Sequence, residues 1–431
     1  MNRILNPPKS KWDKILERPH FDYDPLMKEI EEILFNVKDN GDKALKEYTS
    51  KFDKVNIDTF QVSKVELKIA KHEVSKALSK AIDVARSNIE LFHKAQLSNT
   101  ISRETTPGVR CWQKTLPIEK VGLYIPGGTA PLISTVLMLA IPAKIAGCSE
   151  IVLCTPPGKD GKIASPIIYA ADLLGIKKIY KVGGAQAIAA MAYGTESIPK
   201  VYKIFGPGNQ FVTAAKLKVS LENVAIDMPA GPSELAIIAD RTCNPEYVAS
   251  DLLSQAEHGP DSQVILVSKS ESFLDLVDKE VEKQLKDLPR KEIAREALSK
   301  SKMILMRNDD EIIELINEYA PEHLIIMCEN FADMSERIKN AGSVFLGKYS
   351  AESAGDYATG TNHTLPTNGT AKAYSGITTS SFMKTISFQQ LSSYGLFNIG
   401  SYVEELAEAE DLFAHKNAIT IRLKQYNRKP L

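Results

Sequence analysis

The order of hydrophobic and polar residues divides the chain into two parts. Up to about residue 100, apolar residues recur at helical spacing, so this part is predicted to be mainly helical. Two helices are expected near 25–38 and 43–51, with Asn40-Gly41 as the break between them. Ser63-Lys64-Val65-Glu66 has the pattern of a capping box, which marks the start of a further helix.

From Ile118 onward, short apolar runs of strand type alternate with helical patterns. The first group of expected strands lies near 120–125, 150–154, 178–182, 201–205 and 224–227. After Gly231-Pro232 the same alternation resumes, with strands expected near 234–239, 263–267, 302–306, 323–327 and 343–346. Such regular alternation predicts βαβ units built around parallel sheets, so the chain is expected to hold two α/β layers.

The last part of the chain has a different composition. Residues 347–376 are rich in Gly, Ser, Thr and Asn, and a loop of this length inside a compact domain is usually functional or disordered. The stretch from Ser381 is expected to be helical, and it ends in a basic tail over 422–429.

Composition excludes several classes of protein. The chain has 431 residues with 53 Lys and Arg against 54 Asp and Glu, so bulk charge favours neither nucleic acid nor an anionic membrane as partner. No signal peptide and no membrane span are expected, because no apolar run is long enough. The five cysteines show no CxxC pairing, so we expect a reducing cytoplasm and neither a disulfide framework nor a thiolate zinc site.

Three glycine-rich turns each follow an expected strand: Pro126-Gly127-Gly128, Gly183-Gly184 and Gly206-Pro207-Gly208-Asn209. Ligands of open α/β sheets bind at the carboxyl ends of the strands, where glycines let main-chain N–H groups approach a phosphate. None of the turns is a GxGxxG fingerprint, and each alone also fits a tight strand–helix turn. Together they favour a shared nucleotide crevice, with Tyr124, Gln186 and Asn209 as contacts for ribose and base.

A second set of residues has the chemistry of metal ligands. Gln255 and His258 are three residues apart at the end of an expected helix, so they are predicted to share one face of it. Asp356 lies among small residues, and His415 lies in the C-terminal helical region. Two nitrogen and two oxygen ligands suit Zn²⁺, and also Mn²⁺ or Co²⁺. A neutral glutamine ligand indicates a site that also accepts substrate atoms.

Glu322 and His323 follow Pro321, which holds the backbone extended at an expected helix-to-strand junction. A neutral imidazole can accept an alcohol proton, and the carboxylate beside it can activate water. The dipeptide alone fits a surface turn equally well. Ser233 lacks the GxSxG context of a nucleophile, so a hydrogen bond to a ligand is its expected role.

The remaining histidines are harder to interpret singly, because a structural role is the commoner outcome for any one of them. His72 and His93 are expected on solvated faces of the N-terminal helices, without a role. His363 closes the motif that begins at Gly355, and Glu410 lies five residues before His415.

Taken together, these motifs resemble the histidinol dehydrogenase family over nearly the whole chain, in the family's order and spacing. The motifs that carry the resemblance are Tyr124-Ile125-Pro126-Gly127-Gly128, Gly206-Pro207-Gly208-Asn209, Ala230-Gly231-Pro232-Ser233-Glu234, 255–259, Pro321-Glu322-His323-Leu324, 355–363 and 414–418.

The resemblance implies a role for each candidate residue. It implies that the ligands of one Zn²⁺ per subunit are Gln255, His258, Asp356 and His415. It implies that the catalytic acid–base pair is Glu322 and His323. Further residues near the substrate, beside His323 and the zinc ligands, would be Ser233, His363 and Glu410. The contacts to the cofactor NAD would be Tyr124, Gln186 and Asn209.

The resemblance also implies a fold and an activity. The fold would be α/β, with two incomplete Rossmann-like parallel-sheet domains, a helical N-terminal region and a small C-terminal helical segment swapped in a homodimer. The expected divisions are 1–100, a helical region packing on the second α/β domain; 101–230, the NAD-binding domain; 231–360, the domain with metal and catalytic residues; and 361–431, which reaches the partner subunit. The activity would be NAD-dependent four-electron oxidation of L-histidinol to L-histidine through bound histidinal, in the cytoplasm.

Three other functions fit parts of the pattern. A zinc-dependent hydrolase of a small amino compound would use Glu322 as base, but would leave the three glycine turns without a role. An aldehyde dehydrogenase would need Cys148 or Cys154 as nucleophile, and both are expected in the core. A metal-stabilised scaffold without activity would not need the Glu322–His323 pair.

Overall fold

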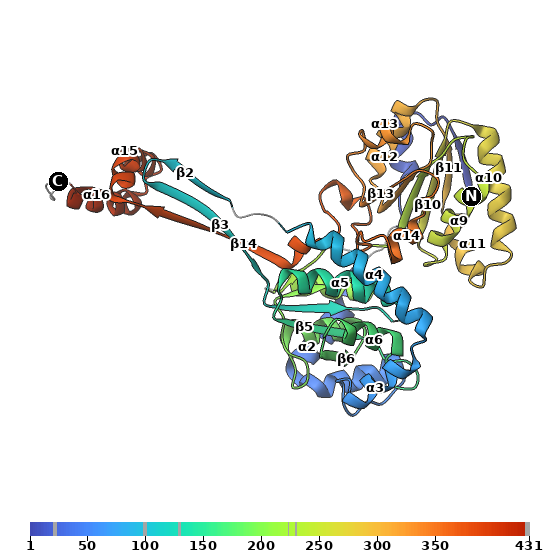
Figure 1. The fold of residues 1–431 in the computed structure, drawn as a ribbon, viewed down its shortest axis with the longest axis horizontal. Helices are drawn as coiled ribbons and strands as arrows, with labels where there is room; N and C mark the ends of the chain where they lie inside the picture. The colour runs from blue at the N-terminus through green and yellow to red at the C-terminus, as the bar shows by residue number, and fades with distance from the viewer. Residues whose placement is uncertain (20–23, 98–100, 128–130, 223, 229–230, 427–431) are drawn as a thin grey trace. The chain divides into compact units, whose positions relative to one another are not determined.

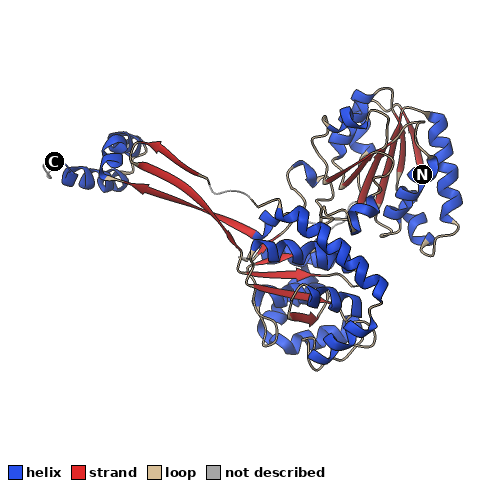
Figure 2. Ribbon diagram, in the orientation of Figure 1, coloured by secondary structure: helices blue, strands red, loops and turns tan. Residues whose placement is uncertain are grey.

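The computed structural model describes residues 1–19, 24–97, 101–127, 131–222, 224–228 and 231–426. The chain forms two compact units. The first unit combines Met1–Gln96 with Ile118–Phe382, and the second combines Leu97–Pro117 with Met383–Leu431. The first unit contains two parallel sheets covered by helices, and the second unit contains a small antiparallel sheet with two helices (Figures 1 and 2).

The first sheet of the first unit has five parallel strands in the order β6-β5-β4-β7-β8. Its strands are β4 (Lys120–Tyr124), β5 (Glu150–Thr155), β6 (Lys178–Lys181), β7 (Lys203–Phe205) and β8 (Ala225–Ile226). The helices that connect them are α5 (Ile133–Ala146), α6 (Ser165–Leu173), α7 (Gly184–Tyr193) and α8 (Gln210–Ser220). The order reverses between β4 and β7, which places a ligand crevice at the carboxyl ends of these strands.

The second sheet repeats this order with one strand added at its edge, as β1-β11-β10-β9-β12-β13. Its strands are β1 (Asn2–Leu5), β9 (Glu234–Ile238), β10 (Gln263–Ser268), β11 (Lys302–Leu305), β12 (His323–Ile326) and β13 (Ser343–Leu346). The helices of this half are α9 (Pro245–Ala256), α10 (Glu271–Leu285), α11 (Lys291–Ser299), α12 (Asp309–Tyr319), α13 (Phe331–Ser335) and α14 (Glu352–Tyr357). The prediction of two parallel α/β layers is therefore confirmed.

The N-terminal region is mainly helical, as predicted, with one departure in detail. Its helices are α1 (Trp12–Ile15), α2 (Asp24–Tyr48), α3 (Lys64–Glu73) and α4 (Lys76–Lys94), with the π-helical turn η2 (Thr49–Asp53). The chain begins with a strand, β1, which pairs with the edge strand β11. The two expected early helices are present within the span of α2, because Gly41, at φ 48°, has non-helical geometry and separates them at the expected break. The capping box of Ser63 and Glu66 is present.

The packing of this region differs from the expectation. It was expected to lie on the second α/β half, and β1 and Trp12 do pack there. Helices α2, α3 and α4 instead pack against α7, α6 and α5, which belong to the first sheet. The N-terminal helices therefore cover one side of the half that contains the first sheet.

The second unit joins two distant segments of the chain. Its sheet has the order β14-β3-β2, with β2 (Ser102–Thr106), β3 (Val109–Pro117) and β14 (Met383–Leu391), and its helices are α15 (Ser393–Ala409) and α16 (Phe413–Tyr426). Residues from Ser381 were expected to be helical, but Met383–Leu391 is a strand that pairs antiparallel with β3 over its whole length. The strand conformation of β14 depends on pairing with β3, which is remote in the sequence, so the local sequence pattern does not predict it.

The segment 347–376, expected to be a functional or disordered loop, contains α14 and a 3-10 turn at Thr370–Lys372. The core of the second sheet lies in strands β9, β10 and β12, whose residues are all buried. None of the helices in the described ranges combines the length and the apolar character needed to cross a bilayer.

Candidate active site

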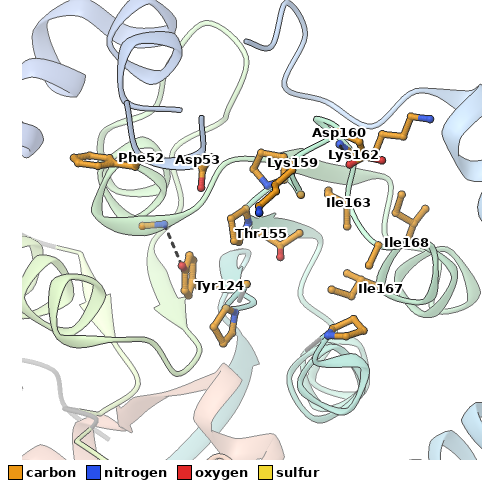
Figure 3. Close-up of a pocket in the computed structure, with 18 of the residues that line it drawn as sticks. Phe52, Asp53, Tyr124, Thr155, Lys159, Asp160, Lys162, Ile163, Ile167 and Ile168 are labelled. Carbon is orange, nitrogen blue, oxygen red and sulfur yellow. Dashed lines mark hydrogen bonds between the residues drawn. The ribbon is translucent and has the colours of Figure 1, made fainter. Parts of the chain in front are cut away.

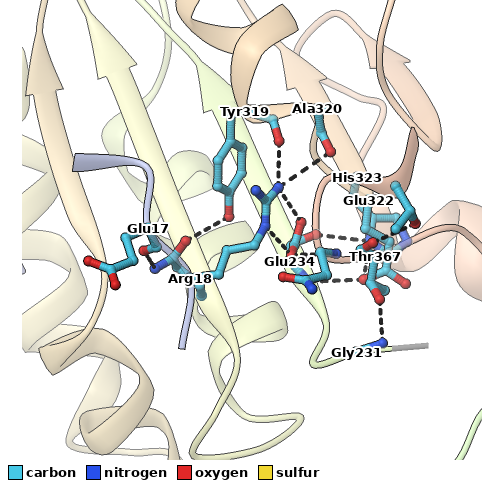
Figure 4. A network of polar contacts seen from close by, with 12 residues as sticks. Glu17, Arg18, Gly231, Glu234, Tyr319, Ala320, Glu322, His323 and Thr367 are labelled. Atoms are coloured by element: carbon cyan, nitrogen blue, oxygen red, sulfur yellow. Dashed lines mark hydrogen bonds and ion pairs between the residues drawn. The ribbon is translucent and has the colours of Figure 1, made fainter. Parts of the chain in front are cut away.

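Glu322 and His323 lie where α12 passes into β12. Ala320 ends α12 in a left-handed conformation at φ 50°, and β12 pairs with β9 so that His323 lies beside Leu235. The main chain of Glu234, the first residue of β9, anchors both side chains. Its N–H donates to Glu322 Oε2 at 2.9 Å, and its carbonyl accepts from His323 Nδ1 at 3.2 Å (Figure 4). Because a carbonyl oxygen can only accept, Nδ1 carries a proton and the lone pair of a neutral His323 is on Nε2.

Three carboxylates surround the His323 ring. Its Nδ1 lies 3.6 Å from Glu322 Oε2 and 3.7 Å from Glu352 Oε1, and its Nε2 lies 3.6 Å from Asp356 Oδ1. Burial lowers the pKa of the imidazole, but Glu352, Glu322 and Asp356 outweigh burial and raise this pKa to about 10. Burial raises the pKa of the Glu322 carboxyl to about 8, against the attraction of His323. The site is therefore rich in negative charge. A divalent cation beside these carboxylates would offset their charge and lower the pKa of both His323 and Glu322, so that both side chains could accept a proton near neutral pH.

Next to this pair is a group of potential metal ligands. The ligand atoms of His258, Glu352 and Asp356 all lie within 4.8 Å of one another. Gln255 is fully buried, and neither atom of its amide group has a hydrogen-bond partner among the described residues. Unpaired buried amide atoms are costly, so a bound ion or substrate group is a natural partner for them. Imidazole, carboxylate and amide donors fit a divalent cation such as Zn²⁺.

The local structure around these ligands differs from the expectation in one respect. Gln255 and His258 were expected on one helical face, but α9 ends at Ala256 and His258 lies just beyond it. The N–H of His258 donates to the carbonyl of Gln255 at 3.2 Å, which keeps the two residues together. The helix ends early because Gly259-Pro260 cannot continue it.

Glu352 is a site residue that sequence reasoning missed. It is buried at the start of α14, and its Oε2 has no partner among the described residues. A signal was present, because Glu352 and Asp356 are four residues apart and such a pair shares one face of a helix.

The site lies at an unexpected edge of its sheet. β9 begins at Glu234, directly after Ser233, and β12 begins at His323, directly after Glu322. All four residues therefore lie at the amino ends of these strands. Helix α9 follows β9 and returns to that edge, which explains why Gln255 lies at its last turn. The second sheet thus presents its polar residues at the edge opposite to the usual ligand crevice of such folds.

Two residues expected near the substrate lie in the first unit. His363 Nε2 is 3.4 Å from the hydroxyl of Thr135 on α5, so its segment contacts the first half of the unit. Burial lowers the pKa of the His363 imidazole. Ser233 is half-buried, and its carbonyl accepts from the N–H of Gln263 at 3.2 Å. Ala230, the first residue of its motif, lies outside the described residues.

Glu410 and His415 belong to the second unit. Both are exposed, Glu410 at the end of α15 and His415 within α16. Their expected part in the site of a partner subunit stays a prediction.

His93 is not on a solvated face as expected. It is fully buried on α4, with Nδ1 donating to the carbonyl of Ile89 at 2.9 Å and Nε2 lying 3.3 Å from Asn362 Nδ2. Asn362 also donates to the carbonyl of Met138 at 2.7 Å. His93 thus helps to fix the segment that carries His363. His72 is exposed, as expected.

A cavity of about 930 Å³ opens at the carboxyl ends of the first sheet (Figure 3). All three expected cofactor contacts, Tyr124, Gln186 and Asn209, line it. The hydroxyl of Tyr124 accepts from the N–H of Gly184 at 3.1 Å, and Asn209 Oδ1 caps α8 by accepting from the N–H of Val212 at 3.1 Å. The cavity thus has the position and the size of a dinucleotide site.

Glycine is required behind this cavity. Gly206 has φ 126°, and a Cβ there would lie 2.1 Å from the carbonyl oxygen of Tyr124. A Cβ at Gly127 would lie 2.1 Å from Pro156. Gly128, the last residue of that expected turn, lies outside the described residues.

Asp53, at the end of η2, lines the cavity, and no sequence motif predicted this. Its Oδ2 is buried and has no hydrogen-bond partner among the described residues. Burial raises the pKa of this carboxyl to about 6.

The cysteines do not fit a nucleophile. Cys154 is fully buried in β5, and the Cys148 thiol lies 3.8 Å from the carbonyl of Phe382. Burial raises the pKa of the Cys148 thiol to about 12 and raises that of Cys154 further, so both stay protonated at neutral pH.

The fold and the site define the class of protein: an α/β enzyme with two doubly wound sheets, a nucleotide-sized cavity and a buried glutamate–histidine pair beside candidate metal ligands. The family model "Histidinol dehydrogenase" matches residues 16–423. The chain belongs to the histidinol dehydrogenase family.

Individual relatives agree. The chain is 57% identical over 423 residues to the histidinol dehydrogenase of Bacteroides thetaiotaomicron, covering 98% of this chain and 99% of the relative. It is 53% identical over 400 residues to that of Escherichia coli K12, covering 92% and 91%. The crystal structure of the Elizabethkingia anophelis histidinol dehydrogenase has a TM-score of 0.97 with this chain, at 54% identity and 99% coverage of both.

Proposed function

We propose that this protein oxidises L-histidinol to L-histidine with two NAD⁺, through histidinal held in the same site, as the last steps of histidine biosynthesis in the cytoplasm. The observation that carries the proposal is the cluster of His258, Glu352 and Asp356, with Asp356 Oδ1 3.6 Å from Nε2 of His323, in a chain of this family. A hydrolase would leave the cavity of the first sheet unused.

Zinc would be held by Gln255, His258 and Asp356, with His415 of the partner subunit as fourth ligand. When bound, Zn²⁺ supplies a chelating centre for the amine and imidazole of the substrate, and NAD⁺ in the cavity supplies the hydride acceptor for each step. Tyr124, Gln186 and Asn209 line that cavity and would contact the dinucleotide. The homodimer would bring Glu410 and His415 to the partner's site.

His323 performs the proton transfers. Because Nδ1–H donates to the carbonyl of Glu234, the lone pair of Nε2 takes the alcohol proton as hydride leaves the carbinol carbon. The products of this step are the aldehyde and a protonated imidazole, which returns its proton to solvent.

Glu322 acts in the second step. The N–H of Glu234 holds one oxygen of its carboxylate, so the other oxygen can accept a proton from water as that water adds to the aldehyde. A proton from solvent adds to the former carbonyl oxygen and completes the hydrate, and Glu322 then releases its proton to solvent. His323 then takes a hydroxyl proton of the hydrate while the second hydride leaves, and the carboxylic acid forms.

The test is direct. Purified protein with histidinol and NAD⁺ should form two NADH per histidine, and a chelator should abolish the reaction until Zn²⁺ is restored. Activity that persists in protein free of metal would contradict the zinc site. Failure to form NADH from histidinol, with hydrolysis of an amino-acid amide or ester instead, would favour the hydrolase.

A further inference from the structure

A half-buried arginine lies behind the acid–base pair. Arg18, in the segment after α1, donates from Nε and Nη2 to the two carboxylate oxygens of Glu234 at 2.5 and 2.9 Å (Figure 4). Nη2 also donates to the carbonyl of Tyr319 at 2.5 Å, and the guanidinium lies 4.0 Å from the centre of the Tyr319 ring. A planar guanidinium that is bidentate and stacked in this way fixes the orientation of its partner.

Glu234 connects this arginine to the acid–base pair. Its carboxylate, which is 3% exposed, is held by Arg18 and by the N–H of Asn368 at 2.8 Å. Its main chain, which joins the side chain at Cα, holds Glu322 through the N–H and His323 through the carbonyl. The side chain and the main chain of one residue therefore face Arg18 and the acid–base pair respectively.

Arg18 also balances charge at this point. Besides Arg18, no Lys or Arg of the described residues forms an ion pair with Glu234 within 4.0 Å. Without it, a buried carboxylate would be left close to the carboxyl of Glu322, and breaking such a pair is strongly unfavourable. The most direct relief is rotation of Glu234 toward water, which would move the first residue of β9.

We infer that Arg18 is a positioning residue for the reaction: through Glu234, it holds the main-chain groups that keep Nδ1 of His323 protonated and Nε2 directed at the substrate. This inference rests on the proposed function. It extends the active site to the N-terminal segment, which no motif of the sequence indicated.

The test is chemical rescue. Arg18→Ala should lower kcat by about 10- to 100-fold, the usual effect of removing a partner that orients an active-site group. Its KM for histidinol and its zinc content should change little, because Arg18 contacts neither. Millimolar guanidinium should restore kcat in Arg18→Ala and leave the wild type unchanged, since it can reoccupy the space beside Glu234.

Controls separate positioning from folding. Arg18→Lys keeps the charge but cannot be bidentate, so it should recover only part of kcat. Arg3→Ala removes an exposed ion pair with Asp275 in the same N-terminal segment, and it should leave kcat unchanged. If Arg18→Ala does not fold, Glu234→Gln takes its place, because it keeps the shape and weakens the same contact.

A spectroscopic measurement is independent of turnover. In ¹⁵N-labelled protein, the His323 signal, assigned by its loss in His323→Asn, should report protonated Nδ1 in the wild type, a mixed state in Arg18→Ala, and recovery with guanidinium. A wild-type kcat in Arg18→Ala, or a loss that guanidinium does not reverse with an unchanged His323 signal, would overturn the inference. A wild type inactive on histidinol, but with the signals as expected, would overturn the proposed function instead.

Discussion

Glu322 and His323 depend on one residue for their geometry, yet they are proposed to act on different atoms. Glu322 accepts a hydrogen bond from the N–H of Glu234, whereas His323 donates one from Nδ1 to the carbonyl of the same residue. The first bond holds Glu322 as an acceptor, and the second holds His323 as a donor. Glu322 can act as a base toward water, and His323 keeps its free nitrogen for the substrate. Substitutions at the two positions should therefore affect different quantities.

Glu322→Gln should stop the second oxidation while leaving the first. An amide cannot take the proton of water, so NADH formation from histidinal should fall by about 10²- to 10⁴-fold. Stopped-flow absorbance with histidinol and with histidinal as substrates distinguishes the two steps. Full retention of NADH formation from histidinal would remove Glu322 from water activation.

His323→Asn should keep the metal and lose turnover. Both steps require its Nε2 as base, so kcat should fall by about 10²- to 10⁴-fold. Zinc content, measured by atomic emission, should match that of the wild type. Loss of zinc in this variant would make His323 a ligand rather than a base.

Asp53 gives the stability of the protein a defined pH dependence. Burial disfavours the charged carboxylate and raises the pKa of Asp53 in the fold to about 6, from its ordinary value of 3.8. The fold therefore binds the proton more tightly than the unfolded chain, and this contribution to stability is full below the unfolded pKa and lost as pH rises through 6.

Asp53→Asn should remove that loss. Relative to the wild type, the variant should gain about 1 kcal/mol at pH 8, after discounting the pKa shift for partial exposure, and less at pH 5. Urea unfolding at both pH values measures the difference. The exposed Asp58→Asn serves as control, and an equal gain in both variants or at both pH values would contradict the account.

At the scale of elements, the strands of both parallel sheets, except β1, follow from the sequence because each is a short apolar run between turn residues. β14 does not, since its nine residues carry no buried apolar face and owe their conformation to β3. The break within α2 also follows from the sequence, because Asn40-Gly41 is a typical helix interruption.

The sequence likewise predicted some residues of the candidate site and missed others. Residues in distinctive motifs, such as Gln255 and Asp356, were found, whereas Glu352 and Asp53 have ordinary neighbours. Arg18 was missed because its partner Glu234 is remote in the chain. Contacts across the fold, rather than local pattern, give these residues their importance.

Gly206→Ala tests the turn that connects β7 with α8. The new Cβ would meet the carbonyl of Tyr124, so β4 and the cavity wall must shift. Gly161→Ala is the matched control, because Gly161 has φ 75° but no atom within 4 Å of a Cβ. Gly161→Ala should lose about 1 kcal/mol from left-handed strain alone. Gly206→Ala should lose more and also show a raised KM for NAD⁺, measured by urea unfolding and initial rates. Equal losses in the two variants would show that the close approach to Tyr124 has no effect.

At the scale of the whole molecule, the proposed ligands and substrate contacts are divided between two compact units of the chain. Gln255, His258 and Asp356 lie in the first, whereas Glu410 and His415 lie in the second. If the proposed homodimer shares its sites, two different defects can compensate for each other.

Mixing Glu322→Gln subunits with His415→Asn subunits provides the test. Each variant alone should form almost no histidine from histidinol, and histidine formation is the activity measured. A heterodimer has one site that combines an intact Glu322 with an intact His415, so refolding the mixture should restore about a quarter of wild-type activity if subunits pair at random. Mixtures that stay inactive would argue against an exchanged tail.

The pairing of β3 with β14 has a consequence for how the protein is made. During synthesis, the ribosome completes β2 and β3 long before β14 emerges. The two-stranded ribbon of β2 and β3 therefore lacks its third strand while most of the first unit is translated. During this time the unpaired edge of β3 can form hydrogen bonds with strands of other nascent chains. The second unit can close only when translation is nearly finished, so truncated products should contain a structured first unit and a protease-sensitive ribbon.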